Sequence, residues 1–205
     1  MAITSYSTLV SAIGDELNRA DLSSVIPTWI GLAEATFNRM LRHRRMLCRA
    51  TAELDTQFTA LPADFLEAKN IQLNTNPVTS LEFVTLEYAD KLRASLSGST
   101  PRYYTVLGDT IEVVPTPSSD ETIELVYYKK ITALSSTNTT NWVLAYHPDL
   151  YFYATLQHSA PYLKDDPRLE IWSAITTNLI DQINRESDKA EHSGATLKIR
   201  ANPLE

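Results

Sequence analysis

The sequence predicts an α+β protein in which a helical bundle, formed by the N- and C-terminal helices, carries an inserted antiparallel β-rich lobe. Apolar residues recur at helical spacing near both ends, whereas the middle alternates between apolar and polar residues around a tight turn. Each amphipathic helix must bury its apolar stripe, so the helices of the two ends are expected to pack together. We therefore expect one domain, with a bundle of residues 1–45 and 146–191, a β-rich insertion of residues 46–135 and an extended tail of residues 192–205.

Helical spacing predicts two helices at the N-terminal end. The first runs from about Tyr6 to Asn18. The second follows Ser23 and Ser24, either of which could be its N-cap, and has Pro27 in its first turn. Its apolar stripe consists of Ile26, Trp29, Ile30, Ala33, Phe37 and Leu41.

The pattern changes after Arg45. The expected strands that follow cover residues 46–54, 68–73 and 80–84. Residues 61–65 indicate a strand end and a turn, and residues 85–96 indicate a small helix. Residues 95–101, which are rich in serine, are expected to form a surface loop.

The clearest β signal is a hairpin in which residues 102–107 and 110–114 flank Gly108 and Asp109. Two prolines end its second strand. Residues 121–129 then alternate, with Ile123, Leu125 and Tyr127 on one face. We expect these segments to form a meander of three antiparallel strands.

The chain returns to helix at Pro148. Residues 150–153 are apolar or aromatic on all sides, which is typical of a helix buried on most of its surface. The last long helix is expected to start at Asp166 and Pro167, with aspartate as the cap, and to fade near Glu191. Its apolar stripe consists of Leu169, Trp172, Ile175, Leu179 and Ile183.

Composition limits the classes of function. The 205 residues carry a net charge of −7, which argues against a protein that mainly wraps nucleic acid and would suit a surface that DNA slides past. We expect no signal peptide, because the first residues lack a basic stretch followed by an apolar one, and no apolar run is long enough for a membrane span, so no membrane partner is expected. The single cysteine, Cys48, excludes an intrachain disulfide and fits a reducing compartment.

Motifs for catalysis, cofactors and metals are missing from the sequence. Asp64, Glu67 and Lys69 superficially match a metal-dependent nuclease pattern, but that chemistry needs carboxylates from two adjacent strands. The turn chemistry of aspartate explains the segment better. The four histidines lack the spacing of a zinc site. We expect no enzyme and no cofactor, although a hydrolase or nuclease built from scattered residues remains an alternative.

One basic cluster stands out in this acidic chain. It consists of Arg39, Arg42, His43, Arg44, Arg45 and Arg49. The cluster could be a solvated helix end, favoured by the negative pole of the helix, or it could contact phosphates. We favour an intersubunit ion-pair surface formed by Arg39, Arg42, Arg44 and Arg45. A nucleic-acid-binding module that uses residues 39–49 is the alternative function.

The order of several motifs from about Arg39 onward resembles the phage adaptor proteins related to tail tubular protein A, which are head-to-tail connectors. The motifs are RHRRM at 42–46, LPADFL at 61–66, PRYYTVLGDTIEVVPTP at 101–117, IELVYYKK at 123–130, LS at 134–135, NWVL at 141–144, PDL at 148–150, YA at 153–154 and Trp172. Residues before these match only as two amphipathic helices. The order and spacing carry the resemblance, because each piece alone is weak.

The resemblance implies a helical bundle with an inserted β lobe, and a ring of twelve subunits beneath the portal protein. It further implies a tail, nozzle or stopper protein on the other face, genomic DNA passing through the channel without sequence recognition, and a place in the virion neck after assembly in the host bacterial cytoplasm. The C-terminal segment is expected to reach the portal. Leu197 and Ile199 alternate there with Lys198 and Arg200, which suits addition of a strand to a partner's sheet.

Overall fold

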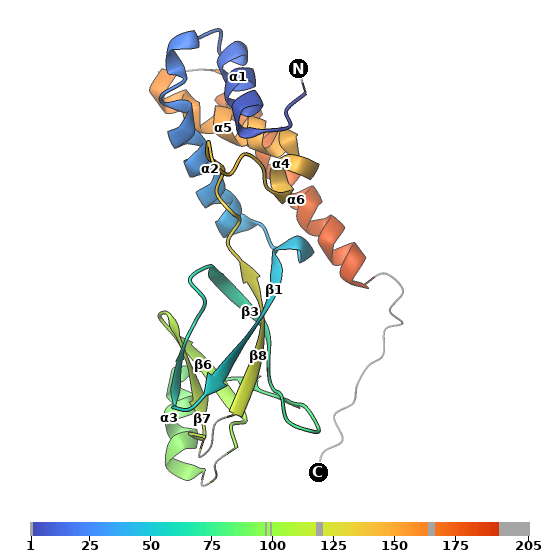
Figure 1. Ribbon diagram of the computed structural model, residues 1–205. Coiled ribbons are helices and arrows are strands. Elements are labelled where there is room, and N and C mark those ends of the chain that lie inside the picture. Colours follow the sequence, from blue (N-terminus) through green and yellow to red (C-terminus); the bar gives the residue numbers. More distant parts are fainter. Residues whose placement is uncertain (1, 97, 99, 118–120, 164–166, 193–205) are drawn as a thin grey trace. The chain divides into compact units, whose positions relative to one another are not determined.

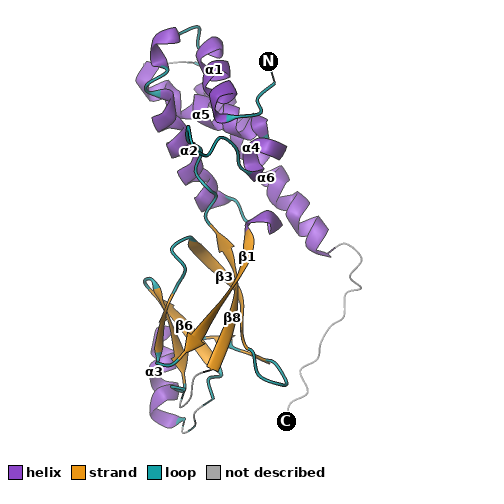
Figure 2. Cartoon of the chain, in the orientation of Figure 1, coloured by secondary structure: helices purple, strands orange, loops and turns teal. Residues whose placement is uncertain are grey.

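The computed structural model shows helices and strands arranged in two compact units (Figure 1). It describes residues 2–96, 98, 100–117, 121–163 and 167–192. The helical unit comprises the described parts of residues 1–45 and 131–205, and the β-rich unit comprises those of residues 46–130. The helices of both chain ends lie in the first unit, and the strands lie in the second together with one helix (Figure 2). This confirms the predicted α+β fold with an inserted β-rich lobe.

The helical unit is organised around its aromatic helix. Its helices are α1 (Tyr6–Glu16), α2 (Ile26–Met40), α4 (Trp142–Tyr146), α5 (Pro148–Leu163) and α6 (Leu169–His192), with a short 3-10 turn at Ala20–Leu22. Helix α5 contacts α1, α2, α4 and α6. Leu150 and Tyr151 are completely buried, whereas Phe152 and Tyr153 are half-buried, so the expectation for residues 150–153 holds in part.

The starts and ends of the first two helices differ from expectation in part. Helix α1 begins with a capping box, in which the Ser5 side chain accepts from the Thr8 backbone N–H and the Thr8 side chain caps Ser5. It ends at Glu16, and Asn18 has a positive φ of 51°. The expected serine N-cap of α2 is wrong, because the cap is Val25, which makes no side-chain bond. The preceding 3-10 turn already bends the backbone here, since the Val25 N–H donates to the Leu22 carbonyl at 2.9 Å.

The buried face of α6 is rotated from the predicted stripe. It consists of Trp172, Thr176, Ile180, Ile183 and Ser187. Leu169 is 39% exposed, and Ile175 and Leu179 are half-buried. A polar contact accounts for the burial of Ser187, whose hydroxyl accepts the Arg44 backbone N–H at 2.9 Å, whereas the buried Thr176 hydroxyl has no hydrogen-bond partner within the described residues. The expected cap Asp166 lies outside the described residues.

The β-rich unit holds two sheets. The first sheet has the order β1 (Leu47–Leu54), β8 (Glu121–Lys129), β3 (Phe65–Leu73), β4 (Thr79–Ser80), and the second has the order β2 (Phe58–Ala60), β7 (Thr110–Val114), β6 (Tyr103–Leu107), β5 (Glu82–Phe83). All neighbours are antiparallel except β5 and β6. Helix α3 (Leu86–Ser95) contacts β6 and β7. A further 3-10 turn, Arg44–Met46, precedes β1.

The predicted three-stranded meander is wrong. The hairpin of β6 and β7 forms as expected, with Gly108 at a φ of 59°, but β8 pairs with β1 and β3 in the other sheet. Pro115 and Pro117 follow β7, and the chain continues into the first sheet instead of turning back beside β7. Proline lacks the N–H that a continuing ladder requires, which favours this change of sheet.

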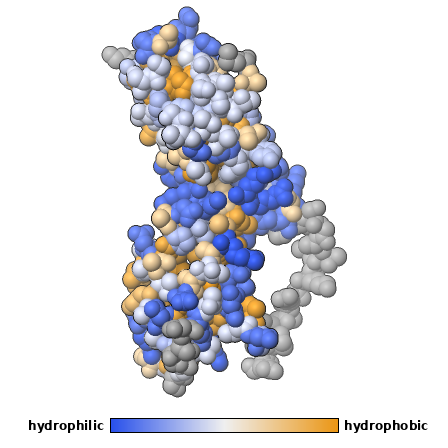
Figure 3. All heavy atoms as spheres, in the orientation of Figure 1, coloured by the Kyte–Doolittle hydropathy of each residue, from blue (hydrophilic) through white to orange (hydrophobic). Residues whose placement is uncertain are grey.

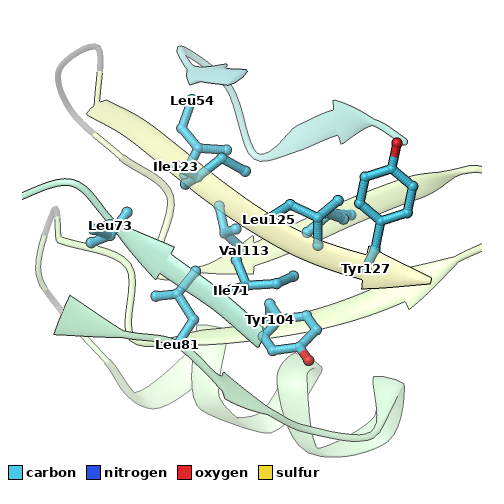
Figure 4. Close-up of a cluster of buried hydrophobic side chains, with 10 residues drawn as sticks. Leu54, Ile71, Leu73, Leu81, Tyr104, Val113, Ile123, Leu125 and Tyr127 are labelled. Carbon is cyan, nitrogen blue, oxygen red and sulfur yellow. The ribbon is translucent and has the colours of Figure 1, made fainter. Parts of the chain in front are cut away.

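The inner faces of the two sheets form one apolar core. Its buried members are Leu54, Ile71, Leu73, Leu81, Tyr104, Ile111, Val113, Ile123, Leu125 and Tyr127. In Figure 4 the side chains of Ile123, Leu125 and Tyr127 come from β8, next to those of Ile71 and Val113. The alternation predicted for residues 121–129 is therefore confirmed.

Candidate functional site

The basic cluster lies at the end of α2 and in the segment that follows it. Arg39, Arg44 and Arg45 are exposed, whereas Arg42 is half-buried. The Arg42 guanidinium donates to the carbonyl oxygens of Leu41 at 2.7 Å and Asn38 at 3.1 Å. Arginine near the last carbonyls of a helix is favoured by the helix dipole, so the structure supplies a local role for Arg42.

The other arginines of the cluster have different surroundings. Arg39 donates to the Thr36 hydroxyl at 3.1 Å, and the Arg45 guanidinium lies 3.8 Å from the centre of the Tyr146 ring. Arg49 belongs to the β-rich unit, where it forms an ion pair with Glu124 at 3.3 Å. The structure therefore divides the predicted cluster, and three exposed cations (Arg39, Arg44 and Arg45) remain together in the helical unit.

A buried histidine, His43, lies within this basic segment. His43 is 1% exposed, and its ring stacks on Trp142 with a centroid distance of 4.9 Å. Its Nδ1 accepts the Arg45 backbone N–H at 3.2 Å, while Nε2 has no hydrogen-bond partner within the described residues. Burial lowers the pKa of His43, and burial likewise lowers that of the neighbouring His147. These histidines are therefore neutral parts of the packing near neutral pH.

Sequence inspection missed a buried carboxylate in the helical unit. Glu34, on α2, is 6% exposed, and its Oε1 accepts the Leu134 backbone N–H at 2.7 Å and the Tyr151 hydroxyl at 3.0 Å. The Asn141 side-chain amide donates to the Tyr151 oxygen at 2.6 Å. Burial raises the pKa of Glu34, although both bonds oppose this, and burial also raises the pKa of Tyr151. The signal was visible, because Glu34 lies four residues after Ile30 on the apolar face of the second predicted helix.

The hydrogen bonds among Glu34, Tyr151 and Asn141 hold elements of the helical unit together. This network joins α2 and α5 to the segment before α4, and Asn141 also caps α4 by accepting the Leu144 N–H at 3.0 Å. No nucleophile or second carboxylate joins it in the described residues. Glu34 therefore positions elements of the fold.

The residues that superficially match a nuclease lie in the β-rich unit. The Asp64 carboxylate accepts the Tyr127 hydroxyl at 2.8 Å, which, together with burial, raises the pKa of Tyr127. The Asp64 carbonyl accepts the Lys130 backbone N–H at 2.7 Å. Over the described residues, no group of three or more His, Cys, Asp and Glu side chains could hold a metal ion. Asp64 thus stabilises the turn before β3.

The outer edge of the first sheet carries a cavity. It measures about 190 Å³ and lies between β1 and β8 of one sheet and β2 and β7 of the other. Its lining includes Ala50, Ala52, Ala60, Ile111 and Leu125. We call this cavity and the adjoining free edge of β1 the edge slot.

The C-terminal residues expected to dock on a partner lie outside the described residues. These are Leu197, Lys198, Ile199 and Arg200. None of the helices described is both long and apolar enough to cross a membrane.

Comparison with known proteins gives a family match for nearly the whole chain. Residues 4–200 match the family model described as SU10 adaptor protein. The match includes α1 and α2, which the sequence motifs had not reached. No curated protein matches the chain.

Proposed function

Since the chain belongs to the SU10 adaptor protein family, we propose that it forms a ring beneath the portal of a tailed phage and joins the portal to the tail. Membership supports a structural adaptor role in the phage virion. The ring, its copy number of twelve and the passage of genomic DNA through its channel are the finer parts of the proposal. The observation that carries it is the match over residues 4–200, which agrees with the order of motifs in the sequence.

A ring subunit needs two complementary side faces and further surfaces for its partners. Apolar residues reach the surface of both units on the face shown in Figure 3. The large exposed ones include Leu32, Met40, Tyr146, Tyr162 and Ile171 in the helical unit, and Phe58, Phe83, Leu86, Tyr88 and Leu107 in the β-rich unit. Aromatic and methionine side chains are typical of interfaces, so these residues are available for subunit and partner contacts. We propose that the two units act as a single adaptor domain without catalytic activity.

The arginines at the end of α2 are proposed to pair with acidic residues of a neighbouring copy. Arg39, Arg44 and Arg45 are exposed, and Arg42 lies beside them. Exposed acids such as Asp181, Glu186 and Asp188 follow one another along α6. Arg44→Glu should weaken ring formation without changing the fold. Salt-sensitive binding of DNA by the free protein, lost in the same variant, would instead favour a nucleic-acid-binding module.

The C-terminal segment is proposed to dock on the portal through Leu197, Lys198, Ile199 and Arg200. The motif alternates apolar and basic residues, as a strand added to a sheet edge does. Deletion of residues 192–205 should abolish portal binding. Unchanged binding after this deletion would exclude the tail as the docking element.

The experiment that tests the whole proposal mixes the purified protein with the portal of its own phage. Native mass spectrometry or single-particle imaging then measures the mass and symmetry of the product, beside the protein alone. A ring on the portal is expected, and its mass gives the copy number. A monomer that ignores the portal would contradict the proposed function.

A further inference from the structure

Strand β1 is a long edge strand. It has eight residues, and within the described residues β8 is its paired neighbour. The side of β1 away from β8 presents backbone N–H and C=O groups that a further strand can pair with. Natural proteins usually shorten or cover such edges, so an edge of this length is suited to accept a strand.

Three of the four side chains on the inner face of β1 are small, the fourth being Leu54. Cys48, Ala50 and Ala52 point toward the core side, and their partners on β8 are Tyr127, Leu125 and Ile123. Each of these small side chains on β1 therefore lies opposite a large one on β8. The cavity of about 190 Å³ lies beside Ala50 and Ala52. The cavity is partly open at the surface, so side chains of an added strand can enter it.

A polar group also lacks a partner at this cavity. Thr59, on β2, lines it, and its buried Oγ1 has no hydrogen-bond partner within the described residues. Buried hydroxyls are nearly always bonded. The void, the unpaired hydroxyl and the free edge of β1 all fit a missing strand at this side of the unit.

We propose that the edge slot of one copy accepts residues 195–201 of a second copy as an added antiparallel strand. This segment reads ATLKIRA, so apolar residues occupy every odd position and polar residues every even one. In the register given below, its residues 197–201 lie opposite residues 50–54 of β1. Ile199 is the large side chain that this segment offers to the small residues of β1, and Leu197 lies next to it on the same face.

The charged side chains of β1 and of residues 195–201 favour one register for the added strand. On the outer face of β1 lie Arg49, Thr51 and Glu53. If Lys198 lies opposite Glu53, antiparallel pairing places Ile199 beside Ala52 and Ala201 beside Ala50, at the cavity. Arg200 then lies opposite Thr51. A shift by two residues in one direction would place Arg200 against Arg49, which like charge disfavours. The same shift in the other direction would place Lys198 opposite Asp55, beyond the end of β1 at Leu54.

This pairing goes beyond the proposed function, because it needs no portal. The portal and the edge slot use the same segment, so one copy's segment occupies one of them at a time. In the free protein, where no portal competes for the segment, we expect the edge slot of one copy to hold residues 195–201 of another. A ring can form on the portal whatever happens in the free protein, so failure of this inference leaves the proposed function intact.

Disulfide trapping of the full chain tests the pairing. In a Cys48→Ala background, one chain carries Ala50→Cys and a second, mass-tagged chain carries Ala201→Cys. Residues directly opposite on paired strands lie close enough for a disulfide. The mixture should oxidise to a dimer containing one chain of each kind. The matched control replaces Ala50→Cys by Ser80→Cys, which lies on β4 at the opposite end of the same sheet.

Two results would overturn the inference. One is trapping no stronger than in the Ser80→Cys control. The other is a bond formed only within a chain that carries both Ala50→Cys and Ala201→Cys, because the segment would then occupy the slot of its own chain.

A charge exchange checks the register independently. Glu53→Lys in the first chain should lower the trapped fraction about three-fold. Adding Lys198→Glu to the second chain should restore it. An unchanged trapped fraction in both cases would exclude the register that places Lys198 opposite Glu53. Circular dichroism of each variant confirms that the fold is retained.

Discussion

The helical unit and the β-rich unit are held together by different means. In the helical unit, Glu34 binds the Leu134 N–H, 100 residues away, and the Tyr151 hydroxyl, 117 residues away. The β-rich unit is one continuous stretch of the chain, residues 46–130. Backbone pairing holds the strands of each sheet together, and an apolar core packs between the two sheets. The β-rich unit also buries a carboxylate, Glu112, which accepts the Gln57 side-chain amide at 2.7 Å and pairs with Arg93. The two units therefore differ in that the polar contacts of the helical unit join both ends of the chain, whereas the β-rich unit is local and leaves an open edge.

Tryptophan fluorescence distinguishes the unfolding of one unit from that of the other. The three tryptophans, Trp29, Trp142 and Trp172, all lie in the helical unit. Their fluorescence reports the unfolding of that unit, while far-ultraviolet circular dichroism reports both. The predictions below use this difference, from the largest expected effect to the smallest.

Deletion of a central side chain should affect one unit. Phe37→Ala is expected to lower the free energy of unfolding of the helical unit by about 3–5 kcal/mol. The Phe37 ring is fully buried, and its centre lies 5.0 Å from that of Tyr151. Ile71→Ala should cost the β-rich unit about 2–5 kcal/mol. Urea titrations followed by fluorescence and by circular dichroism test both variants, and equal shifts of both signals in both variants would show that the units unfold together.

Removal of the buried carboxylate should also be costly. Glu34→Leu leaves the Leu134 N–H and the Tyr151 hydroxyl without their acceptor, which costs about 1–3 kcal/mol for each donor. Glu34→Gln is the matched control, because its Oε1 can accept both hydrogen bonds. Fluorescence-monitored urea unfolding at neutral pH should rank Glu34→Leu far below Glu34→Gln, and equal stabilities would contradict a role for the network.

The same residue gives the helical unit a dependence on pH. Burial raises the pKa of Glu34 above its ordinary 4.5, so the folded state holds this proton more tightly than the unfolded chain. Its stabilising contribution is complete below 4.5 and is lost as the pH rises through the raised pKa. Relative to Glu34→Gln, the wild-type fluorescence transition should therefore weaken with rising pH over this window. Parallel pH profiles of the two proteins would contradict the prediction.

Two glycines should respond in opposite directions. Gly108 has a φ of 59°, so Gly108→Ala is expected to cost the β-rich unit about 1 kcal/mol, although no atom obstructs the new methyl group. Gly31 lies within α2 and is equally unobstructed, so Gly31→Ala should stabilise the helical unit by about 0.5–1 kcal/mol. Thermal unfolding followed by both signals measures each change, and a stabilising Gly108→Ala would show that the turn adopts another conformation.

The basic cluster shows what a sequence pattern can predict and what it cannot. Arg39, Arg42, Arg44, Arg45 and Arg49 are close in sequence, yet Arg42 binds carbonyls, Arg45 stacks on Tyr146 and Arg49 pairs with Glu124. Sequence spacing placed these residues near the end of a helix. The partners of Arg45 and Arg49 come from α4 and β8, which lie far along the chain, so no local pattern contains them, whereas Arg42 binds carbonyls one and four residues before it.

The sequence by itself determined the fold class, the helices at both ends, the hairpin at Gly108 and the adaptor family, because these depend on local periodicity, turn chemistry and the order of motifs. Tertiary structure alone decided that β8 joins β1 and β3, that α6 turns Ser187 inward, and which groups the Glu34 carboxylate binds. Each of these choices depends on which distant backbone groups and side chains satisfy one another. That balance of hydrogen bonding and burial exists only once the segments meet in the folded chain.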